Sequence, residues 1–253
     1  MRIFDSHAHY DDARFRDDAD AVLQDMARHG VEHIINVGCS VPSSRKSIAL
    51  AEKYPFVYAS VGIHPHDTDD AVPQDLATLE ELLRHPKVKA LGEIGLDYHY
   101  QPYSRMTQLE YFIAQMELAQ RADVPVIIHS REATQDLMDV LRRFPVRKLV
   151  CHCFSGSAET AAEIAAMGYH LSFTGVITFS NARRSHEAIR RVPRDRLMIE
   201  TDCPYMAPEP HRGARCDSRM LKYTLAALAE IWGVSPEEAA EITARNAEEF
   251  FDI

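Results

Sequence analysis

Histidines and carboxylates recur along this 253-residue sequence, each at or just after a short apolar run. The first run, IFDSHAHY, carries Asp5, His7 and His9 at alternate positions. Because alternate residues of a strand point to the same face, these three side chains are expected on one side. Imidazole and carboxylate groups are the usual protein ligands of divalent metal ions. Later runs each carry one such group: His64, Glu93, His129, His152 and Asp202.

The number of candidate ligands predicts more than one metal ion. A tetrahedral zinc takes four ligands, and the sequence offers six strong candidates: His7, His9, Glu93, His129, His152 and Asp202. Two cations that share a bridging carboxylate would use all of them. Such a pair, about 4 Å apart, can activate one water and hold both oxygens of a displacement at phosphorus. Zinc, magnesium, manganese, iron and nickel all accept these ligand types, so the cations stay unidentified.

Eight apolar runs are the predicted strands that position these groups. Most are continuous rather than alternating, which is typical of buried parallel strands. Each chemically active residue lies at or near the carboxyl end of its run. The runs are Arg2–Asp5, His33–Gly38, Val57–Gly62, Ala90–Gly95, Pro125–His129, Lys148–His152, Tyr169–Phe173 and Leu197–Thr201.

Segments of helical period separate the predicted strands. Residues 104–122 place apolar side chains on one face, with Ser104 as the N-cap, and Ser235 followed by Pro236 begins a final helix. This alternation predicts an α/β protein with the (β/α)8 TIM barrel fold, in which the active site lies at the carboxyl ends of the strands. An open doubly wound sheet is the alternative, but no glycine-rich dinucleotide motif follows the first strand.

Length and composition predict a single domain over residues 1–253, in the cytoplasm. The net charge of −10 does not indicate extensive duplex contact, although it permits a local grip on a few phosphates. No apolar run is long enough to span a membrane, and the N-terminal segment does not read as a signal peptide. The five cysteines are an odd, scattered set, which predicts free thiols in a reducing compartment.

Simpler interpretations compete at several positions. Glu93 is also compatible with a buried salt bridge, and Asp202 with the cap of a turn. Gln108 is expected to reach the mouth of the site or to lie in the core, with no preference. Cys151 and Cys153 alternate with His152 and should face away from it. Residues that could support the ligands from behind are Asp5, Asp97, Tyr98 and Glu200. The proline-containing stretch 203–217 is expected to be an active-site loop.

The sequence resembles the TatD family of metal-dependent deoxyribonucleases, within the amidohydrolase superfamily. The matching stretches keep their order along the chain: DSHAH, VGIHPH, LGEIGLDY, IIHSR, CHCFSG, ETDCPY and the pair Arg212–Gly213. The resemblance implies a barrel with two metal ions, one held by His7, His9, Glu93 and Asp202, and the other by Glu93, His129 and His152.

The resemblance also implies roles in catalysis and substrate binding. Glu93 and Asp202 would be catalytic, and His64 would contact a substrate phosphate or help the leaving group. Arg131, Gln108 and Arg212 are weaker candidates for substrate contact. The expected substrate is DNA or another phosphodiester, cleaved as by a 3′-5′ exonuclease on single-stranded ends, and the family permits a monomer without an obligate protein partner.

This chain departs from the family pattern in one loop. The family usually has serine where Cys203 stands, and after Arg-Gly it has a basic residue followed by asparagine, glutamate and proline. Here Cys216, Asp217 and Ser218 replace that last trio. The loop was expected to border the substrate, so the departure bears on the identity of the substrate rather than on metal chemistry.

Two other functions remain open from the sequence. A small-molecule amidohydrolase that cleaves a lactone, an amide or a phosphotriester would share the metal-activated water. Such enzymes often bridge their metals with a carbamylated lysine at the end of the fourth strand, where this chain has Glu93. A non-enzymatic metal-binding protein is the other alternative, and a site closed to solvent would support it.

Overall fold

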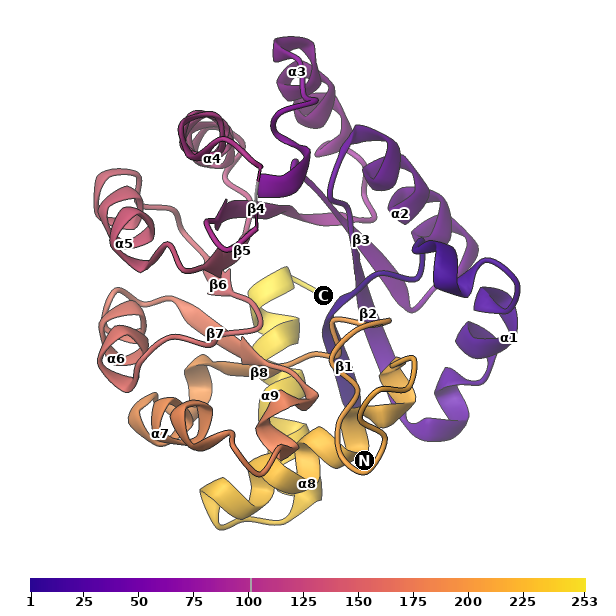
Figure 1. Cartoon of the computed structure of the whole chain (residues 1–253). Helices are drawn as coiled ribbons and strands as arrows, with labels where there is room; N and C mark the ends of the chain where they lie inside the picture. Colours follow the sequence, from indigo (N-terminus) through magenta and orange to yellow (C-terminus); the bar gives the residue numbers. More distant parts are fainter. Residues whose placement is uncertain (101) are drawn as a thin grey trace. The chain divides into compact units, whose positions relative to one another are not determined.

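The computed structural model describes every residue except Gln101. Eight strands form a sheet in which the strand order follows the sequence, β1 to β8 (Figure 1). A helix follows each strand, and the pairs β1–β2, β3–β4, β4–β5, β5–β6 and β7–β8 are parallel. The predicted fold class, a (β/α)8 barrel, is therefore confirmed, and all eight predicted strand runs overlap observed strands.

Contacts divide the chain into two compact units, the first comprising Met1–Asn36 with Cys153–Ile253 and the second Val37–His152. The prediction of one domain over residues 1–253 stays a prediction. The strands of the first unit are β1 (Ile3–Ala8), β2 (Val31–Val37), β7 (His170–Phe173) and β8 (Leu197–Ile199). Its α-helices are α1 (Ala19–Gln24), α6 (Ala158–Ala166), α7 (Arg183–Arg191), α8 (Leu221–Trp232) and α9 (Pro236–Phe251).

Within the first unit, the chain that follows β8 is bonded to β1. The Asp202 amide donates to the His7 carbonyl at 2.9 Å, and the His9 amide donates to the Cys203 carbonyl at 2.8 Å. These bonds fix the residues after β8 beside the carboxyl end of β1. The last helix, α9, covers the other ends of the same strands: Phe251 stacks on Phe4, and the Asn246 amide donates to the Leu197 carbonyl at 2.8 Å (Figure 1).

The second unit contains four strands that pair in sequence order, with a helix after each of the first three. Its strands are β3 (Val57–Val61), β4 (Val88–Asp97), β5 (Val126–Arg131) and β6 (Leu149–Cys151). Its helices are α2 (Val41–Lys53), α3 (Pro73–Leu82), α4 (Arg105–Ala122) and α5 (Thr134–Arg143). Short 3-10 helices in the two units are η1 (Ala13–Phe15), η2 (Met26–His29), η3 (Pro65–Asp67), η4 (Gly175–Thr178), η5 (Arg194–Arg196) and η6 (Ser218–Met220).

The predicted helix starts are confirmed. Ser104 is the N-cap of α4, where its hydroxyl accepts from the Thr107 amide at 3.2 Å. Ser235 is the N-cap of α9, and its hydroxyl accepts from the Glu238 amide at 3.1 Å. Each cap satisfies an amide that has no partner within its own helix. The stretch 203–217 contains no helix, as predicted.

Glycine allows β4 and β5 to lie unusually close. Gly95 has φ +137°, and a Cβ placed there would lie 2.0 Å from the His129 carbonyl oxygen. Only glycine fits this approach, because any side chain would collide with the neighbouring backbone. The register of β4 against β5 also shifts between Leu91 and Ile94, and Glu93 lies within that irregularity. A local bulge of this kind re-aims a side chain, which here is the side chain of Glu93.

Candidate metal centre

The first ligand group consists of His7, His9 and Asp202, all in the first unit. Nε2 of His7 lies 3.1 Å from Nε2 of His9. The Oδ1 atom of Asp202 lies 3.8 Å from the first of these nitrogens and 3.4 Å from the second. One ligand atom from each of the three residues falls within 4.8 Å of the others. Two imidazole nitrogens and a carboxylate oxygen that face one another in this way fit the ligand set of a divalent cation.

Backbone geometry explains how the first ligand group forms. His7 lies in β1 and is fully buried, and His9 follows the strand with its side chain 13% exposed. Asp202 has φ +55°, a left-handed conformation that aspartate tolerates better than most residues. The two hydrogen bonds that join this segment to β1 are made by the Asp202 amide and by the carbonyl of the next residue, Cys203. The structure brings His7, His9 and Asp202 together, while their role with Glu93 as ligands of one ion stays a prediction.

Asp5 supports this group from beneath, where it is fully buried. Its Oδ1 accepts from the amides of His7 and Thr201 at 3.3 and 2.9 Å. Its Oδ2 accepts from the hydroxyls of Thr201 and Ser218, each at 2.6 Å. Burial raises the pKa of Asp5 to about 6, although the bonds from Ser218 and Thr201 oppose the rise. Asp5 therefore ties the chain before His7 to the segments after β8.

The residues that depart from the family pattern belong to this buried layer. Cys203 and Cys216 are 0% and 1% exposed, and burial raises the pKa of both thiols well above the ordinary range. Ser218 bonds to Asp5 and to the Tyr10 hydroxyl, while Asp217 caps η6. All four side chains are buried. These side chains are therefore turned inward, whereas contact between the loop and a substrate stays a prediction.

The second ligand group consists of His64, Glu93, His129 and His152, all in the second unit. Oε1 of Glu93 lies 2.7 Å from His152 Nε2 and 2.8 Å from His129 Nδ1. Nε2 of His64 lies 3.6 Å from the same oxygen. Three imidazoles therefore surround one carboxylate oxygen, and the carboxylate is 4% exposed. This arrangement is a second set of ligands with the chemistry that a divalent cation requires.

The predicted positions of these ligands along their strands need one correction. Glu93 was expected at the end of its strand, but β4 continues to Asp97, so Glu93 lies inside it. His129 likewise lies inside β5, whereas His64 and His152 follow their strands as predicted. The predicted run of the fourth strand ended at Gly95, because glycine often ends a strand. In the structure β4 continues through Leu96 and Asp97, which are buried.

Neutral His64 is held by His66 of the HPH motif, residues 64–66. Its Nδ1 accepts from the His66 amide at 3.1 Å, which leaves the ring proton on Nε2. Burial lowers the pKa of His64 to about 3, although the charge of Glu93 opposes this. The imidazole is therefore uncharged at neutral pH. It can donate one hydrogen bond from Nε2 and does not bring a positive charge to the site.

Two glutamines of α4 hold the strands of the second unit from behind. Gln115 accepts from the Ile63 amide at 2.8 Å and donates to the Ile63 carbonyl at 3.1 Å, directly before His64. Gln108 makes the same pair of bonds with Asp97, each at 2.9 Å. Both side chains are 0% exposed. Gln108 therefore cannot contact substrate as one prediction held, because both atoms of its amide are already bonded to the backbone of β4.

The two other substrate candidates lie at the surface. Arg131 ends β5, and its Nη1 donates to the Tyr100 hydroxyl at 3.1 Å. Arg212 is exposed in the first unit, where its guanidinium lies 4.4 Å from the Phe179 ring centre. Their contact with substrate stays a prediction. Sequence reasoning did not single out His66, whose Nε2 lies 3.1 Å from Asp97 Oδ2, although the spacing of two histidines in HPH was a signal.

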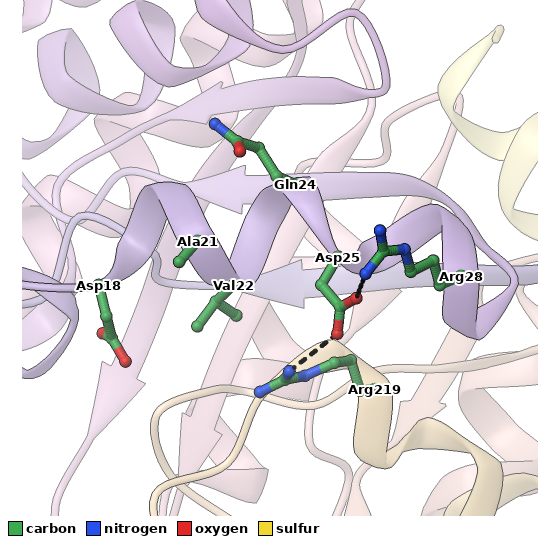
Figure 2. A pocket seen from close by; sticks show the side chains of 7 residues that line it. All are labelled: Asp18, Ala21, Val22, Gln24, Asp25, Arg28 and Arg219. Carbon is green, nitrogen blue, oxygen red and sulfur yellow. Dashed lines mark hydrogen bonds and ion pairs between the residues drawn. The ribbon is translucent and has the colours of Figure 1, made fainter.

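The first unit also contains an open cavity of about 540 Å³, and none of the predicted metal ligands is among the residues that line it. Figure 2 shows that both of its arginines pair with one carboxylate: Asp25 faces Arg219 at 3.1 Å and Arg28 at 3.5 Å. Because Asp25 neutralises both arginines, the cavity offers no unpaired positive charge to an anionic ligand. Its lining residues are Asp18, Ala21, Val22, Gln24, Asp25, Arg28 and Arg219.

Comparisons with known proteins agree over almost the full chain. Residues 4–252 match the model of the family described as TatD related DNase. The chain is 40% identical to the uncharacterized metal-dependent hydrolase YabD of Bacillus subtilis, with 99% of each chain covered. It is 36% identical to the uncharacterized metal-dependent hydrolase YcfH of Escherichia coli, with 100% of this chain and 97% of YcfH covered.

A solved structure shows the same fold. The crystal structure of YjjV, a TatD homologue from Escherichia coli, matches with a TM-score of 0.94 and 32% identity. The match covers 100% of this chain and 98% of YjjV. Family model, sequence relatives and structure agree with the resemblance inferred from the motifs. The chain belongs to the TatD-related DNase family of metal-dependent hydrolases.

Proposed function

We propose that this hydrolase cleaves phosphodiester bonds of DNA, acting on single-stranded ends in the manner of a 3′-5′ exonuclease. One observation carries the proposal: Glu93 Oε1 lies within 2.8 Å of imidazole nitrogens of both His129 and His152. A carboxylate surrounded by imidazoles, in a chain of the TatD-related DNase family, fits a metal-dependent hydrolase better than a salt bridge between Glu93 and a lysine or arginine.

The proposal includes a pair of divalent cations. The ligand sets fit them, since each unit brings imidazole nitrogens and a carboxylate together. Bound divalent cations supply a nucleophilic water at neutral pH and neutralise charge on the phosphate. The residues that would hold them are those predicted from the sequence: His7, His9, Glu93, His129, His152 and Asp202.

The chain's own side chains have distinct tasks in this proposal. Asp202 would orient the attacking water and accept its proton, because its carboxylate is 14% exposed beside His7 and His9. His64 would donate from Nε2 to a phosphoryl oxygen or to the leaving group, since its Nδ1 is already bonded to the His66 amide. Arg131 would add positive charge at the edge of the site, where its guanidinium is partly exposed.

The proposed setting is the cytoplasm, with no obligate protein partner. The five cysteines are free thiols, which supports a reducing compartment. Within the described residues, no helix combines the length and the apolar character that crossing a membrane requires.

The test is a metal-reconstituted assay on defined oligonucleotides. After treatment with a chelator, the protein is supplied separately with zinc, magnesium, manganese, iron or nickel. We expect at least one metal to restore stepwise shortening of a 5′-labelled single strand. Glu93→Gln should lower kcat at least about 100-fold, whereas Glu80→Gln on the exposed face of α3 should leave it unchanged.

The same assay includes the rival substrates. Lactones, amides and a phosphotriester are offered under each metal condition. Turnover of one of these, with no cleavage of any phosphodiester, would show that the chain is a small-molecule amidohydrolase. Circular dichroism of Glu93→Gln confirms that a loss of turnover is not a loss of fold.

A further inference from the structure

We propose that a group of rings that reaches the surface beside the second ligand group stacks unpaired nucleobases of the substrate strand. This inference rests on the proposed phosphodiesterase function and specifies how that site selects single-stranded nucleic acid. The ring group is defined by His66, Tyr100 and Tyr103, together with Arg131.

Ring contacts run without a break from a metal ligand to the surface. The ring centres of His129 and His64 are 4.6 Å apart, as are those of His64 and His66. His66 in turn stacks on Tyr103, with 4.5 Å between ring centres and 9° between planes. Tyr100 meets His66 edge-on at 5.2 Å. A base held on these tyrosines would therefore place its own backbone next to His64.

Tyr100 is unusual in its exposure. It is 45% exposed, whereas most large apolar side chains of the described residues are buried. Its ring lies edge-on to His66, which in turn lies edge-on to His64. Every nucleobase presents a π face, and stacking on an aromatic side chain does not depend on which base it is.

Arg131 supplies a positive charge beside the ring group. Its guanidinium carbon lies 4.9 Å from the centre of the Tyr100 ring, and Nη1 donates to the Tyr100 hydroxyl at 3.1 Å. The adjacent carboxylate, Glu132, accepts instead from His99 Nδ1 at 2.7 Å. Arg131 is thus bonded to a phenol, and its positive charge can meet a phosphate of the strand whose base lies on the ring.

The first unit has a partly similar arrangement near its own ligands, although its arginine, Arg14, is paired with the carboxylate of Asp12 at 3.2 Å. Tyr205, three residues after Asp202, is 47% exposed. The guanidinium of Arg14 lies 3.9 Å from the centre of its ring. Each ligand group is therefore accompanied by an exposed tyrosine with an arginine over it. A duplex keeps its bases stacked on each other, so rings of this kind favour unpaired bases.

The test measures binding of fluorescein-labelled oligonucleotides to metal-free protein by anisotropy. Two ligands are compared: a single-stranded oligothymidine and an abasic strand of the same length. We expect Tyr100→Ala to weaken binding of the oligothymidine about 5- to 150-fold, while its affinity for the abasic strand is unchanged. Tyr100→Trp keeps an aromatic face and should restore binding.

The matched control is Tyr58→Ala. Tyr58 also has a cation near its ring, with Lys87 Nζ at 4.5 Å, but it lies at the start of β3, at the other end of that strand from His64. Its substitution should leave both affinities unchanged. Melting temperatures of all variants confirm that each one is folded.

The outcomes separate this inference from the proposed function. Equal affinity of Tyr100→Ala and wild-type protein for oligothymidine would overturn the ring group as a base platform, even if the protein cleaves DNA. Base-dependent binding that is lost in Tyr100→Ala would support the platform, even if no metal restores cleavage and the proposed function fails.

Discussion

Asp97 holds His129 on the side of the ring opposite Glu93. Oδ2 of Asp97 lies 3.0 Å from His129 Nε2, while Glu93 Oε1 lies 2.8 Å from Nδ1 of the same ring. Burial acts to raise the pKa of Asp97, but the hydrogen bond and charge of His129, together with the His99 amide and the charge of His66, outweigh it and hold the pKa below the ordinary value. The ionised carboxylate therefore keeps the proton on Nε2 and turns the Nδ1 lone pair toward the candidate metal position.

Asp97→Asn should weaken metal binding about 10- to 100-fold, the usual effect of removing a carboxylate that orients a histidine ligand. The amide can still hydrogen bond but cannot fix the ring by charge. Competition with a chromogenic zinc chelator measures the affinity directly. Asp139→Asn on α5, which removes an exposed carboxylate paired with Arg142, is the control. Unchanged affinity in Asp97→Asn would mean that His129 needs no such support.

Gln115→Met should lower the free energy of unfolding by about 2–5 kcal/mol, because the amide and carbonyl of Ile63 would each lose a buried partner. Urea denaturation measures the change. Gln120→Met offers a matched comparison, since Gln120 lies on the same helix but makes an exposed bond to the Pro145 carbonyl. We expect that variant to lose less than about 1 kcal/mol. Similar losses in the two variants would show that the buried bonds of Gln115 contribute little.

Gly95→Ala should cost at least about 4 kcal/mol or prevent folding. The new methyl would meet the His129 carbonyl oxygen, so β4 and β5 would have to separate where they carry Glu93 and His129. Gly213→Ala controls for backbone strain alone, because Gly213 has φ +88° with nothing within 4 Å of the added carbon. That variant should lose only about 1–2 kcal/mol. Thermal unfolding of both proteins provides the comparison, and equal stability would contradict the close approach.

Asp5 should make metal-free protein less stable as the pH rises. Burial raises its pKa to about 6 in the folded protein, against an ordinary value of 3.8, so the folded state binds the proton more tightly. Its contribution is fully present below about pH 4 and is lost as the pH rises through 6. The shift corresponds to about 3 kcal/mol.

Asp5→Asn removes this titration. Between pH 4 and 7, the wild-type free energy of unfolding should fall by about 3 kcal/mol relative to that of the variant. Chemical denaturation at several pH values, with a chelator present, gives both curves. Parallel curves would mean that the four hydrogen bonds to Asp5 keep its pKa near the ordinary value.

Several features of the molecule follow from the sequence alone. Continuous apolar runs separated by helical periods predict parallel strands, and each of the eight runs overlaps an observed strand. Alternation within β1 predicts that Asp5 and His7 share a face, because strand geometry has a period of two residues. Capping at Ser104 and Ser235 is equally local. These predictions succeed because each depends on neighbours within a few residues.

Other features depend on contacts between distant segments. The sequence does not show that Gln108 turns its amide to the backbone of β4, or that Cys203, Cys216 and Ser218 pack inward around Asp5. It does not show that Asp97 and Glu93 hold opposite sides of one imidazole. The types of the residues and their spacing determined which chemistry is available, whereas the close packing of strands and helices decided which side chains face the ligands, because direction and burial are set by neighbours far away in the chain.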